Sequence, residues 1–194
     1  MNQLIWPQSI PTLITKDLVL RPIVDTDAAS YFELCRDIEV MRAWGTAAHQ
    51  SLQDTLDLIQ YLDRSFQNQE IIRWGITVKG AEDTIIGDAG FWRFVKVRCR
   101  GEVGAKLARP YWKRSFTSQA LERVIQYAFE EMNLHSAEGN AEPENLASIR
   151  MIEKIGFIKE GLLHEHSYNA EKGRFVDTYI YSLLKSRFRP SINV

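Results

Sequence analysis

The sequence lacks an excess of either charge. Its 24 Lys and Arg residues nearly balance its 25 Asp and Glu residues. Proteins that bind nucleic acids non-specifically usually carry a clear surplus of basic residues, because the phosphate backbone dominates their affinity. The charge balance therefore disfavours nucleic acid as a partner.

Cysteine is also scarce. Cys35 and Cys99 are the two cysteines, and they stand far apart in the sequence. They form no CxxC motif, and no clustered Cys and His spacing resembles a zinc site. We therefore predict no metal and two reduced thiols, as is usual in a cytoplasmic protein.

Long apolar runs, repeats and linkers are missing as well. No apolar segment approaches the ~20 residues that a membrane-spanning helix needs. Residues 1–11 lack the basic and apolar regions of a signal peptide. Hydrophobic residues make up 45% and charged residues 25% of the chain, as in globular domains. We expect one domain over residues 1–194, with its core at about 18–184, no membrane association and a cytoplasmic location.

The first half of the sequence predicts a strand, two helices and a three-stranded meander. Ser51 and Asp54 have the spacing of a capping box, and the apolar residues that follow recur at helical spacing. From residue 72 the apolar pattern changes to period two, which is typical of strands. The predicted elements are a strand at 18–22, helices from Asp25 or Thr26 to about Asp37 and from Ser51 to about Phe66, and strands at 72–78, 85–94 and 103–107.

The second half predicts two helices that alternate with strands. The strongest helical pattern spans 116–132, and Asn145 and Gly156 fit the two ends of a second helix. Strands are expected at 135–141, 157–165 and 174–184. The order β-α-α-β-β-β-α-β-α-β-β predicts an α/β fold (an α+β mixed sheet), mostly antiparallel and flanked by helices.

Several segments between residues 101 and 161 resemble the acetyl-CoA-binding core of the GNAT superfamily of N-acetyltransferases. The likeness is to the branch that includes the ribosomal-protein N-terminal (Rim-type) acetyltransferases, and it extends over about 18–184. The segments are Glu102–Gly104, Pro110–Trp112, Gln126–Phe129, Pro143–Ser148 and Glu153–Gly161, together with the opening strand Leu18–Pro22.

The resemblance implies that the chain uses acetyl-CoA as a co-substrate and transfers the acetyl group to a primary amine. A helix N-terminus binds a pyrophosphate well, because its N–H groups are free and its dipole end is positive. The strand at 103–108 runs directly into the helix that starts near Ser115, so we expect the pyrophosphate there. The predicted cofactor-binding residues are Leu107, Ala108, Arg109, Lys113, Arg114, Ser115, Phe116, Thr117, Ser118 and Asn145.

The phosphate turn departs from the family pattern. The family has Gln/Arg-x-x-Gly-x-Gly/Ala, whereas this chain has Ser115 and Thr117 at the two small positions. Glycine allows backbone conformations that other residues adopt at a cost. We expect the two hydroxyls to bind phosphate, helped by the charges of Lys113 and Arg114. The alternative is a non-catalytic GNAT-fold binding module with an impaired turn.

Two residues are predicted to be catalytic. In the family, Asn145 contacts the pantetheine arm and Ser148 is a candidate general acid for the departing thiolate. Glu102 is the candidate general base, directly or through a water. The alternative interpretations are a helix cap for Asn145, a surface residue for Ser148 and an exposed strand carboxylate for Glu102.

The acceptor is not encoded in any motif that the sequence shows. A protein N-terminus, an aminoglycoside-like compound, a polyamine and an amino acid all remain open, so the partner is a small-molecule or peptide amine. Trp44, His49 and Trp92 either line the acceptor pocket or belong to loops and core. His164, Glu165 and His166 lie together on a predicted strand, but they lack a further metal ligand. The chain is expected to be a monomer or a homodimer.

Overall fold

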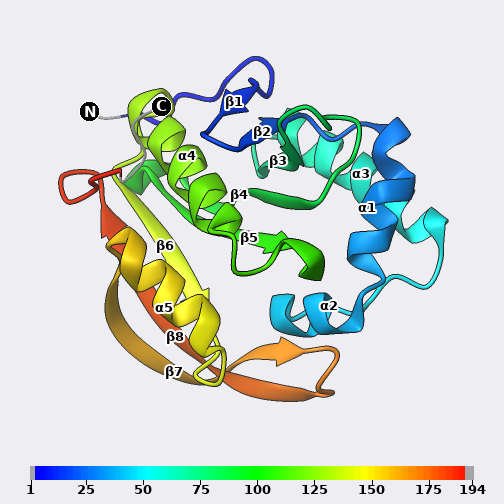
Figure 1. Cartoon of the computed structure of the whole chain (residues 1–194). Coiled ribbons are helices and arrows are strands. Elements are labelled where there is room, and N and C mark those ends of the chain that lie inside the picture. Colours follow the sequence, from blue (N-terminus) through cyan, green and yellow to red (C-terminus); the bar gives the residue numbers. More distant parts are fainter. Residues whose placement is uncertain (1–2, 191–194) are drawn as a thin grey trace.

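The computed structural model describes residues 3–190, which form one twisted sheet of eight strands in the order β1-β2-β3-β4-β5-β6-β8-β7 (Figure 1). All neighbouring strands are antiparallel except β5 and β6, which are parallel. The strands are β1 (Leu13–Ile14), β2 (Leu18–Arg21), β3 (Ile72–Val78), β4 (Gly87–Val95), β5 (Arg100–Leu107), β6 (Ser136–Ala141), β7 (Ile158–Asn169) and β8 (Arg174–Leu184).

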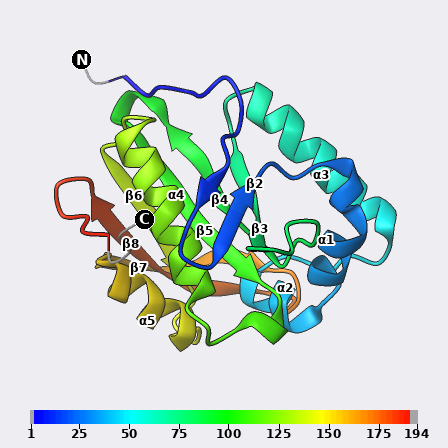
Figure 2. The ribbon, with the colours of Figure 1, turned by 45° about the horizontal axis from the view of Figure 1, so that its top comes forward.

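Helices cover both faces of this sheet (Figures 1 and 2). They are α1 (Ala28–Cys35), α2 (Ile38–Trp44), α3 (Leu52–Gln67), α4 (Phe116–Glu130) and α5 (Leu146–Ile155), with short 3-10 turns η1 (Asp25–Asp27), η2 (Lys96–Arg98) and η3 (Arg109–Tyr111). Helix α4 packs on the face that carries Trp74 and Phe91. Helix α1 lies on the opposite face, where Tyr31 reaches Asp88 on β4. That second face also carries the polar residues of the site described below.

The predicted mixed, mostly antiparallel sheet is confirmed, and so is the meander β3-β4-β5. The Ser51 hydroxyl accepts a hydrogen bond from the backbone N–H of Asp54, which completes the predicted capping box at α3. Gly156 ends α5 with φ 106°, a left-handed conformation that glycine adopts without steric cost. Local capping signals therefore placed these helix ends correctly.

The prediction for the segment after β2 was incomplete. The helix ends at Cys35 rather than Asp37, and a separate helix, α2, begins at Ile38. Asp37 is the reason, because its carboxylate accepts hydrogen bonds from the N–H groups of Glu39 and Val40 and so caps a new helix. Helix α2 matters for the site, because its last residue, Trp44, contacts β5.

Beyond shifts of one or two residues at strand ends, three strands also differ from the prediction. Strand β5 begins at Arg100, three residues before its expected start. The short β1 lies before residue 18, where the predicted core begins, and its two residues carry no pattern long enough to detect. Strand β7 extends to Asn169, four residues beyond the expected end. Its register shifts between Leu163 and Ser167, where Glu165 has φ 46°, and this irregularity interrupts the period-two pattern.

The long β7–β8 hairpin curls below α5 toward α2 (Figure 1). At its tip, the side-chain amide of Asn169 donates to the carbonyl of Arg42 (3.2 Å), and the carboxylate of Glu171 accepts from the N–H of Ala48 (2.8 Å). Lys172 binds Glu142, which follows β6 (2.5 Å). The hairpin tip thus ties α2 to the segment that leads into α5.

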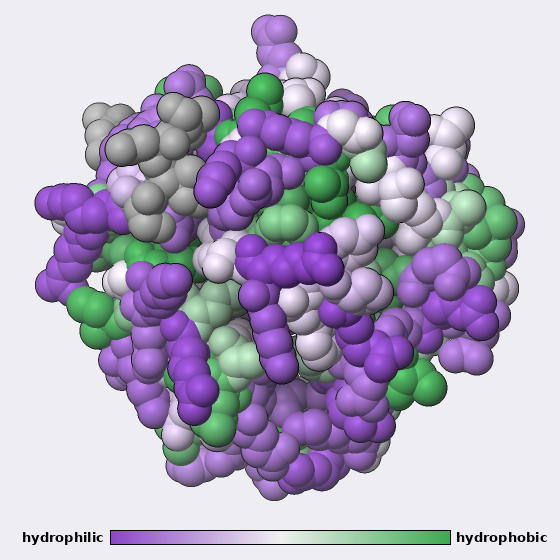
Figure 3. All heavy atoms as spheres, in the orientation of Figure 1, coloured by the Kyte–Doolittle hydropathy of each residue, from purple (hydrophilic) through white to green (hydrophobic). Residues whose placement is uncertain are grey.

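The core lies between α4 and the sheet, and a smaller apolar cluster fills the space among α1, α2 and α3. Over residues 3–190, every helix is too short or too polar to cross a membrane. The face seen in Figure 3 is mostly hydrophilic, with apolar side chains in small groups.

Candidate active site

Strands β5 and β6 separate halfway along their length. They pair only from Arg100 with Ser136 to Glu102 with Glu138, although β5 continues to Leu107 and β6 to Ala141. On its other side β5 stays paired with β4 as far as Leu107. Beyond Glu102, β5 therefore presents an open backbone edge toward β6.

The hydrogen bond at Ala108 fixes which groups face this edge. Its N–H donates to the carbonyl of Ile86 (2.8 Å), on the β4 side. Because N–H groups alternate along a strand, those of Ala105 and Leu107 point toward the open edge. Of the predicted backbone donors at 107–109, Leu107 is thus suitably placed, whereas the N–H of Ala108 is already used. The Arg109 guanidinium pairs with Asp37 (2.6 Å).

The turn that follows β5 ends at the N-terminus of α4. The first hydrogen bond within this helix runs from the N–H of Gln119 to the carbonyl of Ser115 (3.0 Å). The N–H groups of Phe116, Thr117 and Ser118 therefore point out of the helix end. The first turn of α4 contains no acidic residue. This is a ready site for an anion.

The backbone of the turn has the shape that glycine would favour. Ser115 has φ 60° and Lys113 has φ 62°, both in the left-handed region. The replacement of glycine by Ser115 has therefore left the local conformation in place. Lys113, Arg114 and Ser115 are exposed, and the Arg114 guanidinium lies 5.7 Å from the ring centre of Tyr111. The Ser118 hydroxyl donates to the carbonyl of Ser115 (2.9 Å), so it already has an acceptor.

Asn145 acts as the N-cap of α5. Its side-chain oxygen accepts a hydrogen bond from the N–H of Ser148 (3.1 Å). The capping interpretation is therefore confirmed, and any contact with a cofactor would use the remaining amide N–H groups. Ser148 is half-buried in the first turn of α5.

Glu102 lies at the last paired position before the strands separate. Its side chain is 9% exposed, so the alternative of an exposed strand carboxylate is wrong. Burial raises the pKa of Glu102, while its ion pair with Arg93 (3.0 Å) acts in the opposite direction. A carboxylate with a raised pKa holds a proton more readily than an exposed one, as a general base requires.

Asn140, on β6, was not singled out by the sequence. Its side chain hydrogen-bonds to the Glu102 carboxylate, which identifies the amide N–H as the donor. Its side-chain oxygen is buried and has no partner among the described residues. The Glu102 carboxylate and this oxygen together offer acceptors beside the point where β5 and β6 separate. The expected strand at 135–141 placed Asn140 correctly but gave no sign of its role.

A second polar group, also missed by the sequence reading, lies farther along the same sheet face. Asp88 is fully buried and binds Arg73, the Lys106 ammonium (2.6 Å) and the Tyr31 hydroxyl (2.6 Å). Burial alone would raise the pKa of Asp88, but the charges of Arg73 and Lys106 outweigh it and hold the pKa at about 2. We call Tyr31, Arg73, Asp88 and Lys106 the buried polar cluster.

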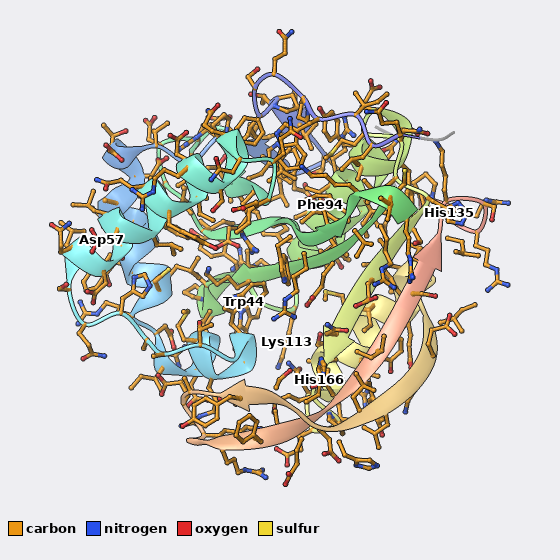
Figure 4. The ribbon with its side chains drawn as sticks, turned by 180° about the vertical axis from the view of Figure 1, so that it is seen from behind. Trp44, Asp57, Phe94, Lys113, His135 and His166 are labelled. Carbon is orange, nitrogen blue, oxygen red and sulfur yellow. The ribbon has the colours of Figure 1, made fainter. Side chains whose placement is uncertain are left out.

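Two tryptophans adjoin this cluster. The rings of Trp44 and Trp92 lie 5.6 Å apart, edge to face, and the Arg73 guanidinium is 4.9 Å from the Trp44 ring centre. Trp44 stands at the end of α2 near the middle of Figure 4. His49 bonds Thr55 (2.8 Å), and burial, with the charge of Lys106, lowers its pKa. All three residues therefore lie on or next to the sheet face that carries Lys106, and their predicted part in an acceptor pocket stays a prediction.

The His164, Glu165 and His166 segment is exposed on β7. His164 and the N–H of Glu165 both bind the carboxylate of Asp177 (3.2 and 2.8 Å). No group of three or more His, Cys, Asp or Glu residues within 3–190 could hold a metal ion. Figure 4 shows His166 well below Trp44, on the hairpin.

Ser115→Gly is expected to have opposite effects on stability and on CoA binding. Glycine adopts the left-handed conformation at position 115 without the steric cost that serine carries. The substitution should therefore raise the free energy of unfolding by about 1 kcal/mol. Loss of the hydroxyl should weaken CoA binding about fivefold, if that hydroxyl binds phosphate. Urea unfolding measures the free energy of unfolding, and calorimetric titration with CoA measures the CoA affinity. Ser115→Asn is the matched control, because asparagine also adopts the left-handed conformation. Tighter CoA binding by Ser115→Gly would show that the hydroxyl makes no phosphate contact.

Comparison with known proteins assigns this arrangement to a family. Residues 17–158 match the Acetyltransferase (GNAT) domain family. The uncharacterized N-acetyltransferase p20 of Bacillus licheniformis is 34% identical over 177 residues, which cover 91% of this chain and 98% of that protein.

Two solved structures share the fold. One is the ribosomal-protein-S5-alanine acetyltransferase of Vibrio fischeri, with a TM-score of 0.80 and 19% identity over 93% of this chain and all of that one. The other is the spermidine N-acetyltransferase of Vibrio cholerae in complex with CoA and spermine, with a TM-score of 0.76 and 21% identity over 88% of this chain and 96% of that one. At these identities the likeness concerns the fold alone.

Proposed function

The chain belongs to the GNAT acetyltransferase family, and we propose that it moves the acetyl group of acetyl-CoA to a primary amine by direct attack within a ternary complex. The observation that carries this proposal is the open edge of β5, with a buried carboxylate at one end and a free helix N-terminus at the other. The CoA-bound structural neighbour supports the choice of donor.

The residues present fit CoA. The N–H groups at the start of α4 would bind the pyrophosphate, and Lys113 and Arg114 add positive charge. The open edge of β5 is suited to an extended pantetheine arm, which can pair with it like a further strand. When bound, acetyl-CoA supplies the activated thioester carbonyl. The N–H groups of Ala105 and Leu107 face the position where that carbonyl would lie and would stabilise the developing oxyanion.

Glu102 would accept a proton from the acceptor ammonium, and the side-chain oxygen of Asn140 would hold a second N–H of the same amine. An α-amine, with a pKa near ~8, needs less help from a base than a lysine near ~10.4. The departing thiolate needs a proton, and Ser148 on α5 is the proposed donor. No covalent enzyme intermediate is required, so neither cysteine takes part.

The proposal is tested with acetyl-CoA and a panel of primary amines, following the release of free CoA. We expect time-dependent CoA release with at least one amine, together with saturable CoA binding by calorimetry. CoA binding without turnover of any amine would contradict the proposed transfer. An absence of CoA binding at millimolar concentration would also overturn it, and would support the non-catalytic binding module with an impaired turn.

A further inference from the structure

The buried polar cluster holds more positive than negative charge. The side chains of Arg73 and Lys106 are 8% and 6% exposed, and both face the single carboxylate of Asp88. Within residues 3–190, neither cation forms an ion pair with another carboxylate. Burial raises the pKa of the Tyr31 phenol, and it raises that of the Cys35 thiol to about 11, so both stay protonated near neutral pH. A buried charge without its own counter-charge is costly, so the surplus calls for an anion.

Arg73 also has hydrogen-bonding capacity to spare. One of its terminal nitrogens binds Asp88, but its Nε is buried and has no partner among residues 3–190. Guanidinium groups bind carboxylates through two parallel N–H donors, and Nε is often one of the pair. The unused donor and the surplus charge therefore point to the same kind of ligand.

Two glycines bring this guanidinium next to the proposed acetyl site. Gly90 and Gly104 are paired across β4 and β5, and Arg73 is paired with Gly90. A side chain at Gly90 would come within 2.9 Å of Arg73 Cγ, and one at Gly104 within 2.8 Å of the Trp92 ring. Because glycine has no side chain, positions 90 and 104 leave room for the Arg73 stem and for the indole rings of Trp44 and Trp92.

The spacing along β5 relates this group to the proposed base. Glu102, Gly104 and Lys106 share one face of the strand, so Gly104 is about 7 Å and Lys106 about 14 Å along the strand from Glu102. Arg73 is in register with Gly90 and, through it, with Gly104, so the guanidinium belongs to the row next to Glu102. A carboxylate on the same molecule as an amine held by Glu102 would point along this face toward Arg73. A polyamine would instead place a second ammonium against two buried cations.

We propose that the acceptor is a primary amine bearing a carboxylate, of the amino-acid type, and that Arg73 and Lys106 bind this carboxylate beside Trp44 and Trp92. This assignment rests on the proposed acetyl transfer. It would set the chain apart from the spermidine acetyltransferases among its relatives, because two buried cations would repel the further ammonium of a polyamine.

Matched pairs of acceptors test the assignment. Methionine and phenylalanine are compared with methioninamide and phenylalaninamide, and spermidine is added. The amides have the less basic amines, so intrinsic reactivity at neutral pH favours them. We expect kcat/KM to be roughly tenfold to a hundredfold higher for the acids, as a charge-assisted contact would give. Equal values, or a preference for the amides or spermidine, would overturn the assignment.

Arg73→Gln should abolish this preference and leave the CoA Kd unchanged. Arg64→Gln, which changes an exposed arginine on α3, is the matched control and should keep the preference. Circular dichroism checks that each variant is folded. If Arg73→Gln does not fold, Lys106→Gln serves in its place, with at least a several-fold loss of preference expected.

A binding measurement separates this inference from the proposed activity. N-acetylmethionine and its amide are titrated calorimetrically into the CoA-bound enzyme, or into the protein alone if CoA does not bind. Selective binding of the acid, lost in Arg73→Gln, would support the anion site even if no amine were acetylated. Equal binding of acid and amide, or no binding of either, would refute it.

Discussion

Asp88→Asn is expected to lower the free energy of unfolding by about 3–5 kcal/mol, because it leaves two buried cations without their shared counter-charge. The substitution keeps the shape of the side chain, so packing contributes little to the loss. Urea unfolding at pH 7 measures it. Asp57→Asn, on the outer surface of α3 (Figure 4), is the control and should change stability by less than about 0.5 kcal/mol.

A double variant separates charge from shape. Asp88→Asn combined with Lys106→Met removes one cation together with the anion and restores the net charge of the cluster. It should therefore regain a substantial part of the stability that Asp88→Asn loses. If the double variant is less stable than Asp88→Asn by the full cost of a second core substitution, the charge surplus is not what destabilises the single variant.

The Asp88 carboxylate should also make the stability of the protein depend on pH in the acid range. The folded pKa of Asp88, about 2, lies below its ordinary value of 3.8. A depressed pKa contributes stability that is fully present above the unfolded value and is lost as pH falls through the folded value. Stability should consequently decline between about pH 4 and pH 2, and the decline should be smaller in Asp88→Asn.

The sequence predicted what local rules determine. Capping at Ser51, the glycine at 156 and the period-two strands each depend on a few neighbouring residues, and each prediction is confirmed. The family likeness predicted the fold class, which is confirmed, and the position of the phosphate turn, which stays a prediction.

The buried polar cluster could not be predicted in this way. Tyr31, Arg73, Asp88 and Lys106 come from four different elements. The register of β3, β4 and β5 and the packing of α1 on the sheet bring them together. In the sequence, none of the four stands in a motif that distinguishes it from other polar residues. Asn140 shows the same limit, because its unpartnered oxygen becomes visible only when the separation of β5 and β6 is known.

Glu102→Gln is expected to lower kcat by about 10³-fold, within the range usual for general acid–base groups, with little change in the CoA Kd. Gln keeps the size of the side chain and can still accept a hydrogen bond from Asn140, but it cannot take up a proton. Steady-state kinetics with the best acceptor, across pH 5–9, measures the effect. Wild type should lose activity as pH falls through the pKa of Glu102, and the variant should lack that limb.

Arg93→Gln tests whether this limb belongs to Glu102. Arg93 is mostly exposed, and its charge opposes the rise in pKa that burial imposes on the carboxyl. Its removal should therefore move the acid limb of kcat/KM to higher pH while leaving the plateau close to that of wild type. Ser148→Ala provides the complementary case: loss of the proposed thiolate acid should lower kcat by about 10²-fold without moving the acid limb. An acid limb that stays in place in Arg93→Gln and persists in Glu102→Gln would assign the base to another group, because neither change could then have altered the proton acceptor.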